Sequence, residues 1–301
     1  MIKVDKLVKK FGDFTALNGI CCEIRDGEVW GLVGINGAGK STLLRTISGI
    51  YKADGGSVEY DGVPVFDNPD IKGKISFVPD ELYLPPLSNM KDIAKKYKLL
   101  KRSFNEKRFF EFAKIFELDI KKRFNSFSKG MRRQAATVLA LAEENPYIFF
   151  DETFDGLDPF KRSFIKQVLR DEAKERGTTV IITSHSLREL EDACDSLAIL
   201  DKGGFVSGAY NDDKTKTGAV KVQLAFSDEY DESRFAEFDV VRFAKRGAVA
   251  TVIFKGEEAE IMSRLRDMSP LLLETLPFTL EETFSYNLDG RKILREEGDE
   301  K

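Results

Sequence analysis

Residues 34–41 read Gly34-Ile-Asn-Gly-Ala-Gly-Lys-Ser41 and satisfy the pattern G-x-x-x-x-G-K-[ST] in full. The apolar run 29–33 precedes them, and Leu43, Leu44 and Ile47 follow at helical spacing. A strand, a glycine-rich turn and a helix in this order are the context in which the pattern forms a phosphate-binding loop. The same order opens a parallel α/β layout, so this segment predicts both a fold class and a phosphate ligand.

The chemistry of such a loop assigns a role to each residue type. Glycines let the backbone curl so that successive N–H groups point at phosphate oxygens, and the helix N-terminus adds partial positive charge. Lys40 is expected to meet the β and γ phosphates, and Ser41 to give its hydroxyl to Mg²⁺. The alternative is a glycine-rich turn that matches by chance, which the agreement of strand, loop and helix disfavours. The predicted nucleotide-binding residues here are Gly34, Asn36, Gly37, Ala38, Gly39, Lys40, Ser41 and Thr42.

Composition indicates a soluble, well-packed protein. The 301 residues are 42% hydrophobic and 33% charged, enough for one large domain and a small one. A net charge of -4 gives no general reason to expect nucleic acid, and three cysteines without metal-site spacing fit a reducing cytosol. No run approaches the ~20 apolar residues that cross a bilayer, and the first residues show no signal-peptide pattern.

The patterning predicts a large domain over residues 1–216. Apolar residues alternate near Ile2 and Ile24, which indicates an N-terminal antiparallel β subdomain. Residues 82–143 carry helical spacing with few strand patterns, so we expect a helical insertion there. Strand-like runs return at 147–150, 179–183 and 197–200, separated by polar helical segments, which restores the parallel sheet.

A polar linker, Asp212-Asp-Lys-Thr-Lys-Thr-Gly218, follows, and we place the domain boundary near residue 216. Residues 217–301 form the predicted accessory C-terminal domain, with strand patterns at 220–226 and 249–254 in a βαβ-like order. Thr279-Leu-Glu-Glu282 has the form of a capping box that opens a last helix.

Two carboxylates and a histidine follow predicted strands. Asp151 and Glu152 stand at the carboxyl end of the run 147–150, where an open α/β sheet holds its ligands. Asp151 is suited to hold Mg²⁺ through water, and Glu152 to accept a proton from the water that attacks a γ phosphate. Such a pair alone is often turn chemistry, and a lone histidine is generally structural. The phosphate loop favours function for the pair, and His185, the only histidine, can reach the same cleft.

Further motifs occur in a fixed order over about residues 1–210. They are Lys10-Phe-Gly12, Phe127-Ser-Lys-Gly-Met131, Gly156-Leu-Asp-Pro159 and Thr183-Ser-His185. Together with the phosphate loop, they resemble the adenine-stacking aromatic (Phe11), signature loop, D-loop and switch histidine of ABC transporter nucleotide-binding subunits. The resemblance implies a P-loop NTPase core with a mainly parallel sheet, the antiparallel β subdomain, the helical insertion and a small C-terminal α+β extension.

The resemblance also implies ATP and Mg²⁺ as cofactors and a pair of subunits packed head to tail. Ser128 and Gly130 of one chain would then touch the γ phosphate held by Lys40 of the other, with positive charge nearby from Lys129, Arg132 and Arg133. The implied catalytic residues are Lys40, Glu152 and His185; the metal residues are Ser41, Asp80 and Asp151; Phe11, Asp80, Ser128, Gly130 and Asp158 join the nucleotide-binding set. Ordinary alternatives remain for single motifs: Ser128 as a helix N-cap, Gly156-Leu-Asp-Pro159 as a turn, and Phe11 as a core residue.

Three positions depart from the family pattern. The signature loop lacks the usual second glycine and final glutamine, as in similar forms among exporter-like members. Asp80 stands where the family typically has glutamine, and its shorter carboxylate could reach Mg²⁺ through water. Phe11 replaces the more usual tyrosine and keeps the stacking face.

The resemblance therefore predicts an ATP-hydrolysing subunit that energises a separate membrane permease, of a bacterial exporter-like type with a C-terminal extension. We expect it in the cytoplasm, on the inner face of the cell membrane, as an ATP-dependent homodimer or as a heterodimer with a related ATPase. One alternative is a soluble ABC ATPase that acts on ribosomes or nucleic acid without a permease. Another is a regulatory module that does not hydrolyse ATP, which the intact Glu152 disfavours.

Overall fold

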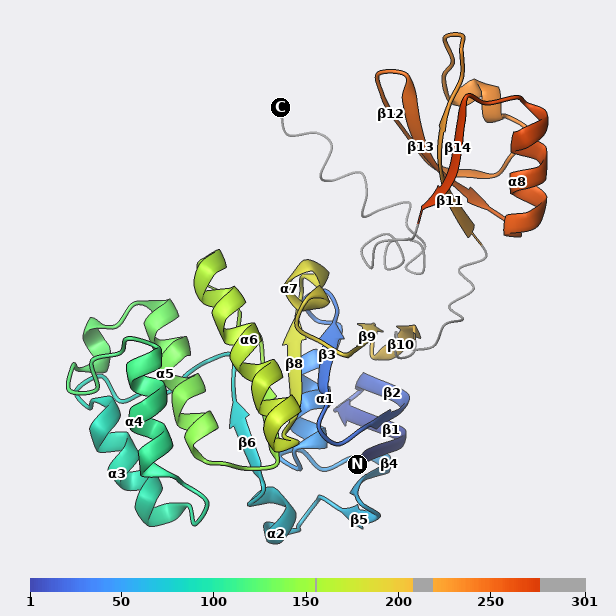
Figure 1. The fold of residues 1–301 in the computed structure, drawn as a ribbon. Helices are drawn as coiled ribbons and strands as arrows, with labels where there is room; N and C mark the ends of the chain where they lie inside the picture. Colours follow the sequence, from blue (N-terminus) through green and yellow to red (C-terminus); the bar gives the residue numbers. More distant parts are fainter. Residues whose placement is uncertain (155, 208–218, 277–301) are drawn as a thin grey trace. The chain divides into compact units, whose positions relative to one another are not determined.

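The computed structural model describes residues 1–154, 156–207 and 219–276 (Figure 1). Contacts divide the chain into two compact units, Met1–Asn211 and Asp212–Lys301, and each is described by itself. The boundary predicted near residue 216 lies outside the described residues.

The first unit begins with a four-stranded antiparallel sheet in the order β2-β1-β4-β5. Its strands are β1 (Ile2–Phe11), β2 (Phe14–Ile24), β4 (Gly55–Tyr60) and β5 (Val63–Pro64). This sheet is the predicted N-terminal β subdomain.

A six-stranded sheet in the order β10-β9-β3-β8-β7-β6 forms the centre of the unit. Its strands are β3 (Val29–Val33), β6 (Ile75–Val78), β7 (Tyr147–Phe150), β8 (Thr179–Ser184), β9 (Ser196–Asp201) and β10 (Gly204–Ser207). All pairings are parallel except that of β9 with β10. Every residue of β3, β7 and β8 is buried, as expected for parallel strands covered on both faces.

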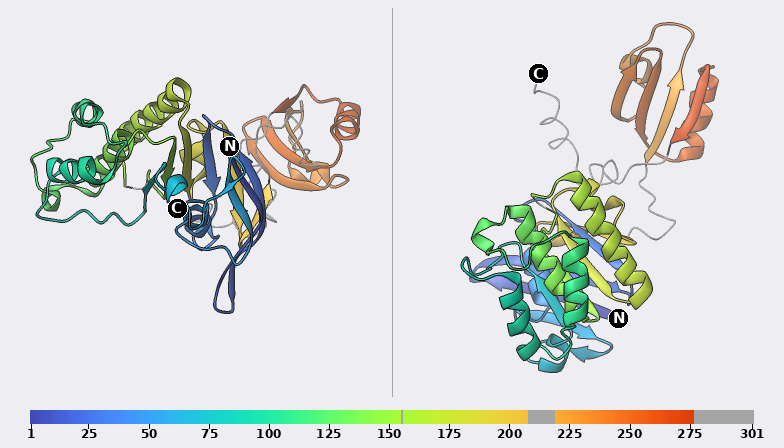
Figure 2. Two further views of the ribbon diagram at one scale, coloured as in Figure 1. Left: turned by 90° about the horizontal axis from the view of Figure 1, so that it is seen from below. Right: turned by 60° about the vertical axis from the view of Figure 1, so that its left-hand side comes forward.

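Helices cover this sheet and connect its strands (Figures 1 and 2). They are α1 (Lys40–Ile47), α2 (Pro69–Lys72), α6 (Pro159–Arg176) and α7 (Leu187–Glu191). One hydrophobic core contains Leu43 and Leu44 of α1, Leu17 of β2 and Leu32 of β3, so α1 is packed between the two sheets. That packing fixes the start of α1, which follows the phosphate loop directly.

The helical insertion contains α3 (Met90–Leu100), α4 (Glu106–Ile115), the 3₁₀ turn η1 (Phe124–Ser126) and α5 (Lys129–Ala142). Asn89 and Asp92 form a capping box at the start of α3, and Asn105 caps α4. The phenylalanines of α4 do not form a single buried face: Phe109 is fully buried, whereas Phe110 is 44% exposed. Within the described residues, no helix combines the length and apolar character that a membrane span requires.

The second unit is a four-stranded antiparallel sheet in the order β12-β13-β11-β14. Its elements are β11 (Ala219–Ala225), η2 (Glu232–Phe235), β12 (Val240–Arg246), β13 (Val249–Lys255), α8 (Glu258–Asp267) and β14 (Leu272–Leu276). Because β13 and β14 both pair antiparallel with β11, they run parallel to each other, and α8 connects them as a split βαβ unit. This agrees with the predicted α+β character, whereas the helix expected from Thr279 lies outside the described residues.

Candidate active site

Four neighbouring parallel strands bring the predicted polar residues to one edge of the central sheet. The phosphate loop follows β3, His185 follows β8, and Asp151 follows β7. Asp80 is the second residue after β6, since Pro79 comes between them. In the sheet order, β3, β8, β7 and β6 are consecutive neighbours, so their carboxyl ends lie side by side.

The phosphate loop has a backbone that only glycine accommodates at two positions. Gly39 has φ 107°, and a Cβ there would lie 2.9 Å from the carbonyl oxygen of Ala16. A Cβ at Gly34 would lie 2.4 Å from the carbonyl oxygen of Leu200. The first helical residue is Lys40, so the N–H groups of the first turn of α1 open toward the loop and form a site for an anion.

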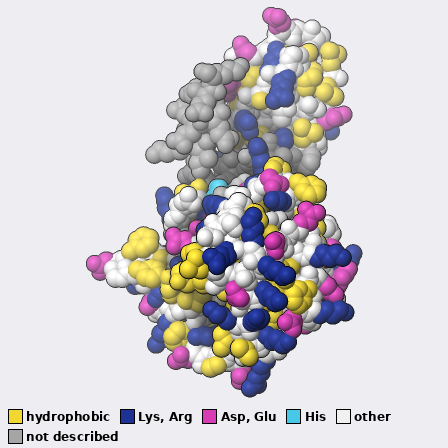
Figure 3. All heavy atoms as spheres, turned by 90° about the vertical axis from the view of Figure 1, so that its left-hand side faces the viewer, with side chains coloured by type: hydrophobic (Ala, Val, Ile, Leu, Met, Phe, Trp, Pro, Cys, Tyr) yellow, Lys and Arg dark blue, Asp and Glu magenta, His cyan; other side chains and the backbone are white. Residues whose placement is uncertain are grey.

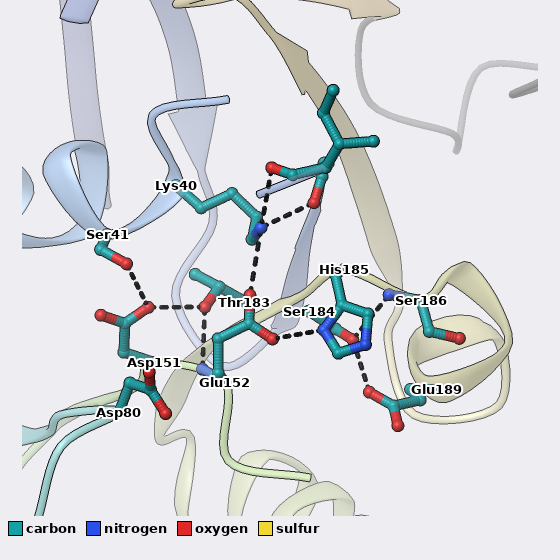
Figure 4. Close-up of polar contacts among 12 residues, drawn as sticks. Lys40, Ser41, Asp80, Asp151, Glu152, Thr183, Ser184, His185, Ser186 and Glu189 are labelled. Carbon is teal, nitrogen blue, oxygen red and sulfur yellow. Dashed lines mark hydrogen bonds and ion pairs between the residues drawn. The ribbon is translucent and has the colours of Figure 1, made fainter. Parts of the chain in front are cut away.

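Lys40 is 5% exposed and occupies the centre of the site (Figure 4). Its Nζ donates hydrogen bonds to the carbonyl oxygens of Gly34 at 2.6 Å and Ile35 at 3.2 Å. The same Nζ forms an ion pair with Glu152 Oε1 at 3.1 Å. Lys40 thus connects the phosphate loop to the acidic end of β7.

Asp151 is fully buried and is held by two hydroxyl groups. Ser41 Oγ donates to its Oδ1 at 3.0 Å, and Thr183 Oγ1 donates to the same atom at 2.9 Å. Burial raises the pKa of the Asp151 carboxyl; the bonds from Thr183 and Ser41 and the charge of Arg45 oppose that rise.

The second oxygen of Asp151, Oδ2, is buried and accepts no hydrogen bond in the described part of the chain. A buried carboxylate oxygen without a donor, beside the Ser41 hydroxyl, suits a divalent cation or its bound water. The residues therefore fit the Mg²⁺ that the sequence predicts. No cluster of three or more His, Cys, Asp or Glu among the described residues offers a metal cage, and Mg²⁺ bound mainly by phosphate and water does not need one.

Glu152 has a strained backbone, with φ 51° in the left-handed region. Its N–H donates to Thr183 Oγ1 at 3.0 Å, which holds this conformation. The conformation lets the two consecutive carboxylates diverge: Asp151 faces Ser41, and Glu152 faces Lys40 and His185 (Figure 4). Glu152 Oε2 lies 3.0 Å from His185 Nδ1.

Thr183 is therefore the residue that links Asp151 and Glu152, a role that its place in the motif Thr183-Ser-His185 does not predict. The role of Thr183 depends on the order of the strands, because a hydroxyl near the end of β8 faces the end of β7 only when those two strands are neighbours. The turn after β8 is also fixed, since Ser184 Oγ donates to Glu189 at 2.5 Å and accepts from the Ser186 N–H at 3.0 Å.

A cleft of about 560 Å³ contains most of the predicted residues. It is lined by Phe11, Phe14, Ala16, Asn36, Gly37, Gly39, Lys40, Ser41, Thr42, Asp80, Glu152 and His185. Phe11 is 46% exposed, so it is not a core residue. Phe14, its partner across the β1–β2 turn, is 65% exposed and is a second aromatic surface in the cleft, which no sequence motif predicted.

Asp80 lines this cleft and also forms an ion pair with Arg133 of α5. The Arg133 side chain is almost fully buried and donates a second bond to the carbonyl oxygen of Pro79 at 2.9 Å. Asp80 is half exposed. The positive charge of Arg133, expected near the start of α5, is thus paired with the carboxylate of Asp80 and is not exposed to solvent.

The remaining predicted residues do not line the cleft. Ser128 is the N-cap of α5, and its Oγ accepts from the Met131 N–H at 3.2 Å. Gly130 approaches Gly156, since a Cβ at Gly130 would lie 3.2 Å from the Gly156 carbonyl oxygen. Asp158 caps α6 by accepting from the Lys161 N–H at 2.9 Å. The signature and D-loop motifs therefore lie together, apart from the nucleotide cleft of their own chain.

Comparisons with known proteins identify the family of the chain. The ABC transporter family model matches residues 17–155. The chain is similar to the ABC transporter ATP-binding protein YtrB of Bacillus subtilis, with 29% identity over 97% of this chain and 99% of YtrB. It is also similar to the linearmycin resistance ATP-binding protein LnrL of the same organism, with 32% identity over 69% of this chain and 68% of LnrL.

Among solved structures, the dimeric post-hydrolysis state of the ATP-binding cassette MJ0796 bound to ADP and Pi superposes with a TM-score of 0.61. It has 27% identity to the chain and covers 68% of this chain and 96% of that one. The chain belongs to the family of ABC transporter ATP-binding proteins and is an ABC-type ATPase.

Proposed function

We propose that this subunit energises a separate membrane permease by closing, as a pair of subunits, around two ATP molecules. The observation that carries the proposal is the separation of the two motif groups: Lys40, Glu152 and His185 share one cleft, whereas Ser128 and Gly130 lie outside it. A head-to-tail pair brings the start of α5 from one copy to the phosphate loop of the other. The helix N-terminus at Ser128 then supplies partial positive charge to the γ phosphate.

The cleft supports a hydrolytic role for its residues. Lys40 binds the β and γ phosphates, and Glu152 accepts a proton from the attacking water while His185 orients its carboxylate through the contact at Nδ1. Phosphate binding by Lys40 would compete with its ion pair to Glu152, which frees that carboxylate for the proton. Ser41 and Asp151, with Asp80 through water, would hold Mg²⁺, which neutralises charge on the phosphates.

The permease contact is proposed at the helical insertion. Large apolar side chains are exposed there: Tyr83 is 88% exposed, Leu87 72% and Leu99 86%. Figure 3 views this side of the first unit and shows hydrophobic side chains gathered among Lys and Arg. Several large apolar residues exposed in one part of a fold favour a surface that binds a partner.

The direction of transport is proposed to be export. The support is the name of LnrL, which refers to resistance, because removal of a compound from the cell is one way to confer resistance to it. The exporter-like form of the signature loop agrees with this direction, and the position of the subunit would be the cytoplasmic face of the membrane.

The test is purification of the tagged chain at native expression from detergent-solubilised membranes, with partners identified by mass spectrometry. We expect a polytopic membrane protein in stoichiometric amount, and its loss with the variant Tyr83→Asp plus Leu87→Asp. Val63→Asp, which adds a charge at the exposed strand β5, is the matched control and should retain the partner. Ribosomal proteins or nucleic acid in place of a membrane protein would instead favour the soluble alternative.

A further inference from the structure

The side chain of His185 is not held in the candidate active site by packing. The imidazole is 49% exposed, and among the described residues its polar contact is with Glu152. A half-exposed ring keeps one orientation only when the turn that carries it is rigid. The residues that fix this turn therefore decide where the imidazole points.

The turn is fixed at Ser184, the last residue of β8, which is almost fully buried. Its hydroxyl accepts from the Ser186 N–H and so closes a turn around His185 (Figure 4). A hydroxyl has one hydrogen to donate, and that of Ser184 goes to Glu189 Oε2 at 2.5 Å. Glu189 therefore decides whether the lone pairs of the Ser184 hydroxyl face the Ser186 N–H.

Glu189 is in turn held by Arg162. The Glu189 side chain is 10% exposed, so its charge needs a partner, and Arg162 Nη1 lies 3.2 Å from its Oε1. The two carboxylate oxygens thus bond to Arg162 and to Ser184, one each, which fixes the plane of the group. This ion pair joins the start of α6 to α7, a helix of 5 residues that is too short to be stable by itself.

Arg162 also contacts the D-loop motif. Its Nη2 donates to the carbonyl oxygen of Leu157 at 3.4 Å. Its Nε is buried and has no hydrogen-bond partner within the described residues, so the bonds at the two terminal nitrogens fix the guanidinium. Contacts therefore run from the Leu157 backbone through Arg162, Glu189 and Ser184 to the turn at His185.

We propose that Arg162 and Glu189 are positioning residues of the ATPase site, which set the orientation of His185 from the backbone of the D-loop motif at Leu157. Neither side chain lines the nucleotide cleft, so both act through His185 and not on the nucleotide. The importance of this for turnover rests on the hydrolytic role proposed for His185. The positioning itself does not, and it can be measured separately.

The first test observes the imidazole directly by NMR. His185 is the only histidine, so the full chain without a histidine tag, labelled with isotopes at histidine, gives one imidazole signal. We expect Arg162→Gln and Glu189→Gln each to shift this signal in the nucleotide-free chain. The double variant should shift it no further than the larger single shift, because both residues act through the same hydroxyl.

Arg170→Gln is the matched control for this test. Arg170 lies on the same helix, α6, but donates at 2.9 Å to the Asp192 carbonyl oxygen, at the end of α7, and not to Glu189. The imidazole signal should therefore stay in place in Arg170→Gln. Thermal unfolding of every variant verifies that the chain is folded. If Arg162→Gln does not fold, Glu189→Gln and Arg162→Lys serve in its place.

The second test separates positioning from a merely structural role. We expect Arg162→Gln to lower kcat about tenfold and to change KM for ATP less than about twofold, because the phosphate loop with Lys40 is intact. Arg162→Lys keeps a charge beside Glu189 and should have a kcat between that of Arg162→Gln and that of the unmodified chain. In a His185→Ala chain, Arg162→Gln should lower kcat no further, because the residue that it positions is absent.

An unshifted imidazole signal in Arg162→Gln and Glu189→Gln would overturn the inference. An equal loss of kcat on adding Arg162→Gln with and without His185 would also overturn it, since a structural residue acts in both backgrounds. By contrast, an unchanged kcat in His185→Ala alone would refute the proposed hydrolytic role of His185, whereas a shifted signal would still establish the positioning.

Discussion

The two motif groups of the first unit differ in how complete each is within one chain. Hydrogen bonds and ion pairs connect every residue of the first group, here called the Lys40 group, in one network. Its members are Lys40, Ser41, Asp151, Glu152, Thr183 and His185. In the Ser128 group, Ser128 caps α5 by accepting from the Met131 N–H, and Gly130 approaches Gly156 of the D-loop motif. The difference agrees with the proposal that the first group binds nucleotide within its own chain, whereas the second acts on a nucleotide that another copy holds.

The strongest way to break the Lys40 group is Glu152→Gln, which keeps the side-chain shape and removes the base. We expect turnover to fall at least about 100-fold, because a general base contributes roughly 10²–10⁴-fold. Binding of ATP should remain, and ATP should trap a dimer, which size-exclusion chromatography detects. Unchanged turnover in Glu152→Gln would remove Glu152 from the role of base.

The division between the groups can be tested by mixing two inactive variants. Lys40→Ala should lose ATP binding, and Ser128→Asp should lose turnover but keep ATP binding and stability, because Asp is as good an N-cap as Ser. In an equimolar mixture, half of random dimers contain both variants, and each of these holds one intact site. We expect ATPase activity to recover to at most about a quarter of the unmodified level if one site suffices.

Absence of any recovery, with mixed dimers shown by native mass spectrometry, would contradict sites that are built from two identical copies and hydrolyse ATP independently of each other. Loss of stability in Ser128→Asp would show that the position tolerates only the Ser cap, and thermal unfolding of the variant alone measures this. The comparison between Lys40 and Ser128 thus depends on two separate readouts, ATP binding by one chain and turnover by a pair.

The Lys40 group could be predicted from the sequence because each of its motifs is contiguous and follows a strand. One rule, that the carboxyl ends of parallel strands share an edge of the sheet, is enough to predict that Gly34, Asp151, Glu152 and His185 lie close together. Thr183 could not be given its role, because its bonds depend on β8 being the neighbour of β7. In the accessory unit, likewise, local patterns indicated β13 and α8 but not that β11 separates β13 from β14.

The buried position of the Arg133 side chain could not be predicted from the sequence either, for a different physical reason. A basic residue in the first turns of a helix is normally exposed, and the sequence does not show that the side chain turns inward to the loop after β6. Its ion pair with Asp80 connects α5, and hence Ser128, to a residue that lines the nucleotide cleft. This pair is therefore a link between the two motif groups within one chain.

The ion pair between Asp80 and Arg133 predicts that loss of one partner lowers the free energy of unfolding more than loss of the other. Asp80→Ala leaves a buried guanidinium without its carboxylate and should lower the free energy of unfolding by about 1–3 kcal/mol. Arg133→Met should cost less, because Asp80 is half exposed and water can solvate its carboxylate. The double variant should recover most of the loss caused by Asp80→Ala. Urea unfolding of the three variants measures this, and a smaller loss for Asp80→Ala than for Arg133→Met would refute the argument.

The smallest expected effect concerns the rigidity of the Lys40 group, and the chain offers a matched pair of threonines. Thr183→Val keeps the side-chain shape and removes the hydroxyl that donates to Asp151 and accepts from the Glu152 N–H. We expect it to lower the free energy of unfolding by about 1–2 kcal/mol and to lower turnover severalfold. Thr153 is equally buried, but its Oγ1 has no hydrogen-bond partner in the described residues, so Thr153→Val should be neutral or slightly stabilising. Thermal unfolding and ATPase assays of both variants decide the point. Equal effects of the two substitutions would show that loss of a buried hydroxyl, not the link between Asp151 and Glu152, determines the result.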